Sequence, residues 1–130
     1  MADIRGVVAG AAITNFLPYV EETAPERVDN RRSEFGDERD PAMREYLTSI
    51  SPVTNAKALK KPTFILHPGL DTRVGLGQAQ ELVKALKANS APVWYFEFTT
   101  ANHANFPASA ANNDFMIASW VWYLKNFVLN

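Results

Sequence analysis

The sequence predicts an α/β fold of about three parallel strands with flanking helices. Three apolar runs, at residues 6–14, 62–68 and 93–98, have the length and composition of buried strands. Helical patterns, in which apolar residues recur every three or four positions, fill most of the chain between and after these runs. Strands that alternate with helices favour right-handed crossovers, and therefore a parallel sheet.

The first predicted strand, residues 6–14, is made of small and β-branched residues. Its start, G-V-V-A-G, has the glycine spacing of a nucleophile elbow. However, Val8 stands where an elbow has serine, and the next residues continue a strand where an elbow needs a helix. No helix or loop precedes this strand. We therefore expect residues 1–130 to form a single partial α/β domain that starts in the middle of a fold.

Residues 16–61 are predicted to be helical and polar. The chain has 27 charged side chains, 13 basic and 14 acidic, and more than half of the 27 lie within residues 21–45. Mixed charges at this density are typical of a solvated helical face. A helix is expected to start at Asp40-Pro41, with the acid as cap and the proline in the first turn. It should end before Pro52, because a residue that precedes proline avoids the α conformation.

The second half of the chain predicts two strands and two helices. The run P-T-F-I-L-H-P and the aromatic run V-W-Y-F-E-F are the second and third strands. Between them, apolar residues mark one face of a helix that ends at about Asn89. The last helix, residues 110–127, has apolar positions over a wide arc, and we expect it to be largely buried.

Composition excludes several kinds of protein. A chain of 130 residues with net charge −1 fits one domain at most and offers no basic surface for nucleic acid or an anionic membrane. No apolar run approaches the roughly 18 residues of a transmembrane helix. The lack of cysteine excludes disulfides and thiolate zinc sites, and there are only two histidines and no phosphate-binding glycine motif. We expect no metal and no cofactor, and a soluble chain whose compartment stays open, with the cytoplasm favoured.

Asp71 and His103 each follow a predicted strand. Ligands and catalytic groups of parallel sheets collect beyond the carboxyl ends of the strands, so both side chains should reach the same edge. There the Asp71 carboxylate could accept the imidazole Nδ1–H of His103, as in a Ser-Asp-His triad whose acid and histidine follow the serine in the chain. Taken singly, Asp71 could be an ordinary turn residue and His103 a surface residue.

Neighbouring residues allow further interpretations. Arg73 is either a donor to a substrate carbonyl or carboxylate, or part of a surface ion pair. A structural role is favoured for His67, and Asn102 and Asn105 are expected to shape the loop around His103. None of the six serines has the G-x-S-x-G context of a nucleophile.

Four segments together resemble the prolyl oligopeptidase family of serine peptidases. Residues 34–56, E-F-G-D-E-R-D-P-A-M-R-E-Y-L-T-S-I-S-P-V-T-N-A, are similar to the region before its catalytic acid. Residues 60–74, K-K-P-T-F-I-L-H-P-G-L-D-T-R-V, resemble the family pattern P-x-L-x-x-H-G-x-x-D-x-R-V. The helix Q-A-Q-E-L-V-K-A-L-K and the loop A-N-H-A-N-F follow in the family's order.

The resemblance implies the C-terminal portion of an α/β-hydrolase fold, with Asp71 as the catalytic acid, His103 as the catalytic histidine and Arg73 as a substrate-binding residue. Two departures stand out: the family's Gly-His-Gly is Asn102-His103-Ala104 here, and its serine elbow would lie upstream of Met1.

We therefore expect the C-terminal part of a serine peptidase, inactive alone, that acts on a peptide or small acyl substrate in the intact enzyme. It should form a homodimer or be complemented by the missing N-terminal half. The alternatives are a non-catalytic α/β interaction module and the equivalent part of an esterase or lipase.

Overall fold

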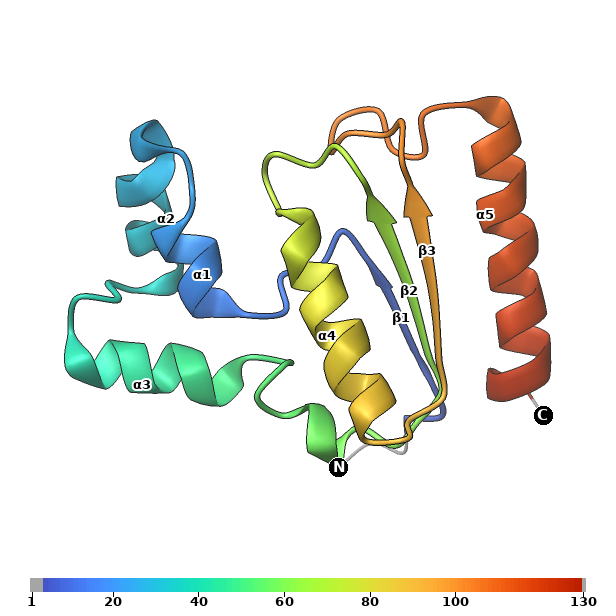
Figure 1. Ribbon diagram of the computed structural model, residues 1–130, viewed down its shortest axis with the longest axis horizontal. Coiled ribbons are helices and arrows are strands. Elements are labelled where there is room, and N and C mark those ends of the chain that lie inside the picture. Colours follow the sequence, from blue (N-terminus) through green and yellow to red (C-terminus); the bar gives the residue numbers. More distant parts are fainter. Residues whose placement is uncertain (1–3, 130) are drawn as a thin grey trace.

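In the computed structural model, which describes residues 4–129, three parallel strands lie between helices (Figure 1). Strands β1 (Val7–Gly10), β2 (Thr63–Pro68) and β3 (Val93–Phe98) are hydrogen-bonded in the order β1-β2-β3. Helix α4 (Leu76–Ala88) lies on one face of the sheet and α5 (Ala110–Tyr123) on the other (Figure 1). The predicted fold class and the adjacency of the second and third strands are confirmed.

The central strand β2 is buried along its whole length, which is typical of a parallel strand covered on both faces. Its side chains alternate between two cores. Ile65 packs in a cluster with the apolar face of α4, whereas Phe64 and Leu66 pack with Tyr123 of α5. Trp94, Phe96 and Phe98 of β3 extend this second core, and the ring centroid of Trp94 lies 4.5 Å from that of Phe127.

One buried hydroxyl joins the end of α5 to the start of the sheet. The Tyr123 hydroxyl accepts a hydrogen bond from the Val7 backbone N–H at 2.9 Å and donates one to the Pro62 carbonyl at 2.6 Å. Burial raises the pKa of Tyr123, and the bond from Val7 opposes this effect only in part. The hydroxyl therefore stays protonated and holds α5 against the ends of β1 and β2.

The first strand is shorter than predicted. It spans Val7–Gly10 and not residues 6–14, because Ala11 has a positive φ of 47° that turns the chain away from the sheet. Beyond the turn, the backbone N–H groups of Thr14 and Asn15 donate to Oε1 of the buried Gln78 side chain, at 2.8 and 2.7 Å. A side chain of α4 thus satisfies backbone groups that the prediction assigned to a strand ladder.

The charged segment forms three short helices to one side of the sheet (Figure 1). These are α1 (Phe16–Glu21), α2 (Val28–Phe35) and α3 (Pro41–Ile50), and single 3-10 turns lie at Pro25–Arg27 and Ala56–Ala58. Helix α3 starts as predicted, since the Asp40 carboxylate accepts a hydrogen bond from the Ala42 N–H at 2.9 Å.

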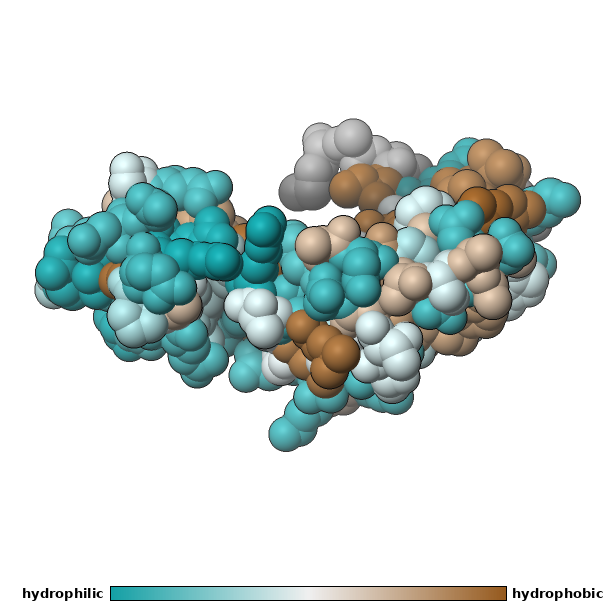
Figure 2. All heavy atoms as spheres, turned by 90° about the horizontal axis from the view of Figure 1, so that it is seen from above, coloured by the Kyte–Doolittle hydropathy of each residue, from teal (hydrophilic) through white to brown (hydrophobic). Residues whose placement is uncertain are grey.

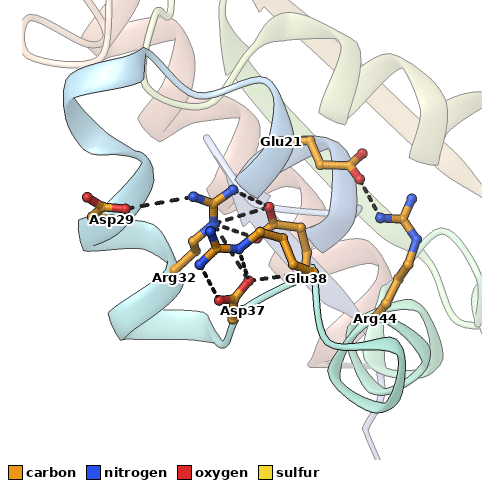
Figure 3. Close-up of polar contacts among 7 residues, drawn as sticks. Glu21, Asp29, Arg32, Asp37, Glu38 and Arg44 are labelled. Carbon is orange, nitrogen blue, oxygen red and sulfur yellow. Dashed lines mark hydrogen bonds and ion pairs between the residues drawn. The ribbon is translucent and has the colours of Figure 1, made fainter.

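Ion pairs connect these short helices. Figure 3 shows Arg44 of α3 directed toward Glu21 of α1, at 2.6 Å, and Arg32 of α2 directed toward Glu38, also at 2.6 Å. Most charged side chains of the segment face solvent, as predicted, whereas Glu38 is buried. The Arg32 guanidinium donates to Glu38, and this bond holds the pKa of the Glu38 carboxyl below its ordinary value despite burial.

The prediction that the last helix is largely buried is wrong for the described chain. Helix α5 ends at Tyr123 and continues as a wider π-helical turn, Leu124–Val128. One stripe of this element packs on the sheet, but Ile117, Val121 and Trp122 of α5 are between 44% and 49% exposed. Viewed from above, hydrophilic residues dominate over α1 and α2, and more hydrophobic residues lie at the opposite end, over α5 (Figure 2). None of the helices within residues 4–129 is long and apolar enough to cross a membrane.

Candidate active site

Two loops meet beyond the carboxyl ends of β2 and β3. The loop after β2 is bonded to the one after β3, because the N–H of Gly69 donates to the Phe98 carbonyl and that of Leu70 to the Ala101 carbonyl, both at 2.9 Å. A Cβ atom at position 69 would lie 3.0 Å from the Cα of Thr99, so glycine allows this close approach. The loops that carry Asp71 and His103 are therefore held together by their backbones.

Asp71 is the acceptor at the centre of the site. Its Oδ1 accepts hydrogen bonds from the backbone N–H of Arg73 at 2.8 Å and of Val74 at 2.9 Å. Its Oδ2 lies 2.8 Å from Nδ1 of His103, and the Asp71 side chain has no exposed surface. Both oxygens are thus engaged, one by the loop of Asp71 itself and one by the imidazole.

The electrostatics of Asp71 favour the carboxylate. Burial opposes ionisation, but the hydrogen bonds from Val74, His103 and Arg73 outweigh it, and the pKa of Asp71 is lowered from its ordinary value. A carboxylate can only accept, so Nδ1 of His103 carries a proton and donates it. At neutral pH the imidazole therefore faces a full negative charge.

The second ring nitrogen of His103 is available. The side chain is 33% exposed, and Nε2 makes no hydrogen bond with any residue from 4 to 129. With Nδ1 donating to Asp71, the neutral ring presents a lone pair at Nε2, which can take a proton from a hydroxyl placed beside it. The serine side chains in the described part of the chain make no contact of this kind.

Asn102 and Asn105 close the His103 loop by a reciprocal set of hydrogen bonds. Oδ1 of Asn105 accepts from the Asn102 N–H at 2.7 Å, and Oδ1 of Asn102 accepts from the N–H of Ala104 and of Asn105, at 2.9 and 3.1 Å. The prediction that the two asparagines shape this loop is confirmed. These side-chain bonds restrain the loop where glycines flank the histidine in the family pattern.

His67 has a structural partner that the sequence did not reveal. The ring is fully buried, and Nε2 lies 2.9 Å from the carbonyl of Val74, so it donates to that oxygen. The N–H of the same residue donates to Asp71, and His67 thus fixes the loop that presents the acid. No sequence signal indicates this contact, because it depends on how the chain turns between positions 69 and 75.

Arg73 is exposed, and its guanidinium makes no hydrogen bond or ion pair with any residue that the structure describes. It lines a cavity of about 200 Å³ together with Tyr19, Asp71 and Glu81, between α1 and the start of α4. The surface ion pair considered from the sequence is absent from residues 4–129. The interpretation of Arg73 as a donor to substrate remains a prediction.

Within the described residues, no three His, Asp or Glu side chains lie close enough together to hold a metal ion. The site therefore consists of the Asp71–His103 pair, the loops that hold it and the exposed Arg73. Such an arrangement can orient an imidazole and stabilise its protonated form. It can act as general base and acid toward a nucleophile placed at Nε2.

The chain is similar in sequence or in structure to parts of three known proteins. Over 69 residues it is 38% identical to dipeptidyl aminopeptidase BIII of Pseudoxanthomonas mexicana, a match that covers 53% of this chain and 10% of the relative. The structure is similar to the acylaminoacyl peptidase of Pyrococcus horikoshii, with a TM-score of 0.86 and 17% identity, over 100% of this chain and 21% of that one. It is also similar to dipeptidyl peptidase 4 of Porphyromonas gingivalis, with a TM-score of 0.74 and 14% identity, over 96% and 16%.

The structural matches show an α/β-hydrolase fold, and this chain spans about a fifth or less of the proteins named here. The model of one family, "Prolyl oligopeptidase family", matches residues 5–129, almost the whole sequence. The chain therefore belongs to the prolyl oligopeptidase family.

Proposed function

We propose that this chain supplies the acid and the histidine of a serine peptidase whose nucleophile lies in a segment outside residues 1–130. Asp71 orients the imidazole and stabilises its protonated form, and His103 is the general base and acid. The observation that supports this proposal is the 2.8 Å contact between Nδ1 of His103 and Oδ2 of Asp71, with Nε2 left unbonded at the carboxyl edge of the sheet.

The proposed chemistry has two steps. In the first, Nε2 takes the proton of the serine hydroxyl as its oxygen attacks the scissile carbonyl, and then gives that proton to the leaving amine. In the second, Nε2 takes a proton from water as the water oxygen attacks the acyl-enzyme, and it then gives that proton to the serine oxygen as the carboxylic acid product leaves. Asp71 remains a carboxylate throughout and stabilises the imidazolium that forms in each step.

A peptide substrate is preferred to an acyl ester because of the relatives. The family is one of peptidases, and the relatives named above are an aminopeptidase, an acylaminoacyl peptidase and a dipeptidyl peptidase. An esterase would use the same pair of side chains, so the distinction depends on measured substrate preference.

Strand β1 is the surface through which we propose that the chain pairs with its missing half or with a second copy. Among the described residues β1 pairs only with β2, so its other edge carries unpaired backbone groups, and Val8 is 44% exposed on it. Pairing of another strand along β1 would extend the sheet toward the position where a serine-bearing strand is needed.

A chimera tests the proposed function. In dipeptidyl aminopeptidase BIII, this chain would replace the segment that it matches, and hydrolysis of a peptide anilide and of an acyl ester would be compared. We expect peptide hydrolysis that falls about 10⁴-fold on replacing His103 by Ala. Arg39→Gln, which changes a surface arginine paired with Asp37, serves as the matched control and should leave the rate unchanged.

The proposal fails if the His103→Ala chimera hydrolyses the peptide as fast as the unmodified chimera. It also fails if the chimera is folded, as judged by a cooperative unfolding transition, but the nucleophilic serine supplied by dipeptidyl aminopeptidase BIII does not react with a fluorophosphonate. A rate on the ester that exceeds the rate on the anilide by far more than the intrinsic reactivity of the two bonds would favour an esterase.

A further inference from the structure

A second cavity, of about 340 Å³, lies between α2 and the loop after β2 and is rich in arginine. Its volume is at the lower end of the range of small-molecule sites, roughly 300–1,000 Å³. Three guanidinium groups and one carboxylate line it. We call it the arginine pocket, and its lining residues are Arg27, Asn30, Arg31, Glu34 and Arg73.

Two of these arginines lack a counter-charge, although acidic residues outnumber basic ones between positions 21 and 45. The guanidinium groups of Arg27 and Arg73 make no hydrogen bond or ion pair with residues 4–129. The other arginines of the charged segment are paired with carboxylates. Arg32–Glu38 and Arg44–Glu21 are drawn in Figure 3, and the remaining pairs are Arg39–Asp37 and, within the pocket, Arg31–Glu34. The missing partner therefore distinguishes Arg27 and Arg73 from these paired arginines.

The side chain of Arg31 is restrained by two neighbouring side chains. Its guanidinium carbon lies 5.0 Å from the centroid of the Tyr19 ring, and its Nη1 donates to Oε2 of Glu34 at 2.8 Å. Its Nε is buried and has no hydrogen-bond partner among the described residues. A buried donor without an acceptor is rare in native proteins, and either a water molecule or a bound ligand would supply the acceptor here.

The arginine pocket and the Asp71–His103 pair are linked through the loop after β2. The side chain of Arg73 lines the pocket, and its backbone N–H donates to Oδ1 of Asp71, whose Oδ2 faces His103. To reach the pocket, a substrate with its scissile bond at Nε2 of His103 must therefore extend along this loop. Planar guanidinium groups bind carboxylates through paired N–H donors, and partly desolvated positive charges that repel one another favour an anionic ligand.

We propose that the arginine pocket binds a carboxylate of the peptide substrate, so that the enzyme prefers peptides with a carboxylate close to the scissile bond. The substrate preference in this inference rests on the proposed function, whereas the binding of a carboxylate can be measured without it. Arg27 and Arg73 are the binding donors, and Arg31, which Tyr19 and Glu34 restrain, completes the site. The carboxylate comes either from an acidic side chain or from the C-terminus of the peptide.

The test is an NMR titration of the ¹⁵N-labelled chain that follows the Nε–H signals of its arginines. Three probes are used: acetyl-Gly-Glu-Gly-amide, its isosteric control acetyl-Gly-Gln-Gly-amide, and acetyl-Gly-Gln-Gly with a free C-terminal carboxylate. We expect at least one carboxylate probe to shift the signals of Arg27, Arg31 and Arg73 saturably, with a dissociation constant on the order of 1 mM. The tighter of the two carboxylate probes identifies the source.

Substitutions sharpen the test. Arg27→Gln and Arg73→Gln should each weaken binding of the carboxylate probe about tenfold, as expected for the loss of one charge-assisted hydrogen bond. The control Arg39→Gln, whose arginine is paired with Asp37, should bind like the unmodified chain. Thermal unfolding of each variant establishes that it is folded.

The inference is overturned if neither carboxylate probe shifts these signals saturably, or if the amide control shifts them equally. It is also overturned if Arg27→Gln and Arg73→Gln bind as well as Arg39→Gln. The titration needs no nucleophile, so its result does not depend on the chimera. If the carboxylate probe binds but His103→Ala leaves the activity of the chimera unchanged, the proposed function is refuted and the assignment of the arginine pocket is not.

Discussion

Replacement of Asp71 by alanine removes the acceptor of three hydrogen bonds, and the structure indicates how much each loss costs. The Val74 N–H is buried and would be left unsatisfied, whereas Arg73 is exposed and the His103 ring is one-third exposed, so both can turn to water. A hydrogen bond to a charged group contributes about 1.5–3 kcal/mol, and we therefore expect Asp71→Ala to lower the free energy of unfolding by about 3 kcal/mol.

Asp71→Asn is the matched variant. Its amide oxygen can still accept from Arg73 and Val74, whereas the charge and the acceptor that faces the one-third exposed His103 are lost, so we expect a decrease in stability of about 1 kcal/mol. Urea denaturation at pH 7 measures both values. Equal stability of the Ala and Asn variants would show that the side-chain oxygen at position 71 does not hold the loop, because the two variants differ in this oxygen.

The effect of Asp71→Asn should depend on pH. The folded pKa of Asp71 lies below the unfolded value, because hydrogen bonds from Val74, His103 and Arg73 outweigh the effect of burial. The ionised group therefore contributes its full stability above an unfolded pKa of about 3.9 and loses it as the pH falls toward the folded pKa. The stability difference between the parent chain and Asp71→Asn should be constant at neutral pH and shrink below about pH 4.

Other predictions concern the sheet and its edge. Tyr123→Phe leaves the Val7 N–H and the Pro62 carbonyl without their partner, and it should lower the free energy of unfolding by about 1–2 kcal/mol in urea; an unchanged midpoint would contradict the role of the hydroxyl. We expect the chain to self-associate in sedimentation equilibrium and Val8→Lys, on the open edge of β1, to weaken this association; a parent chain that is monomeric at micromolar concentration would count against the edge. A fluorophosphonate should not label the chain alone, and stoichiometric labelling of one serine would refute the absence of a nucleophile.

The sequence was sufficient to predict the contact between Asp71 and His103. Both residues follow apolar strands, and in a parallel sheet this places them at one edge whatever the details of packing. Strands β2 and β3 were predictable for a related reason, since buried parallel strands are short, continuous apolar runs. These features depend on local patterns and on the general geometry of parallel sheets.

The remaining features depend on contacts between distant positions. Strand β1 ends at Gly10 because Ala11 turns the chain and the Gln78 side chain, over 60 positions away, satisfies the following backbone groups. The bond from His67 to Val74 and the grouping of Arg27 and Arg31 with Arg73 likewise follow only from the folded chain. A wide apolar arc predicted burial of α5, but an arc cannot indicate which of its residues the neighbouring elements cover.

The contact with Asp71 fixes His103 with its proton on Nδ1 and its lone pair on Nε2. The ¹⁵N chemical shifts and two-bond ¹H–¹⁵N couplings of the imidazole, measured at a pH where the ring is neutral, report this directly. We expect a protonated Nδ1 and an unprotonated Nε2, with the opposite tautomer in Asp71→Asn, whose amide would donate to Nδ1. A parent chain with its proton on Nε2, or with rapid exchange between both tautomers, would show that Asp71 does not fix the tautomer of His103.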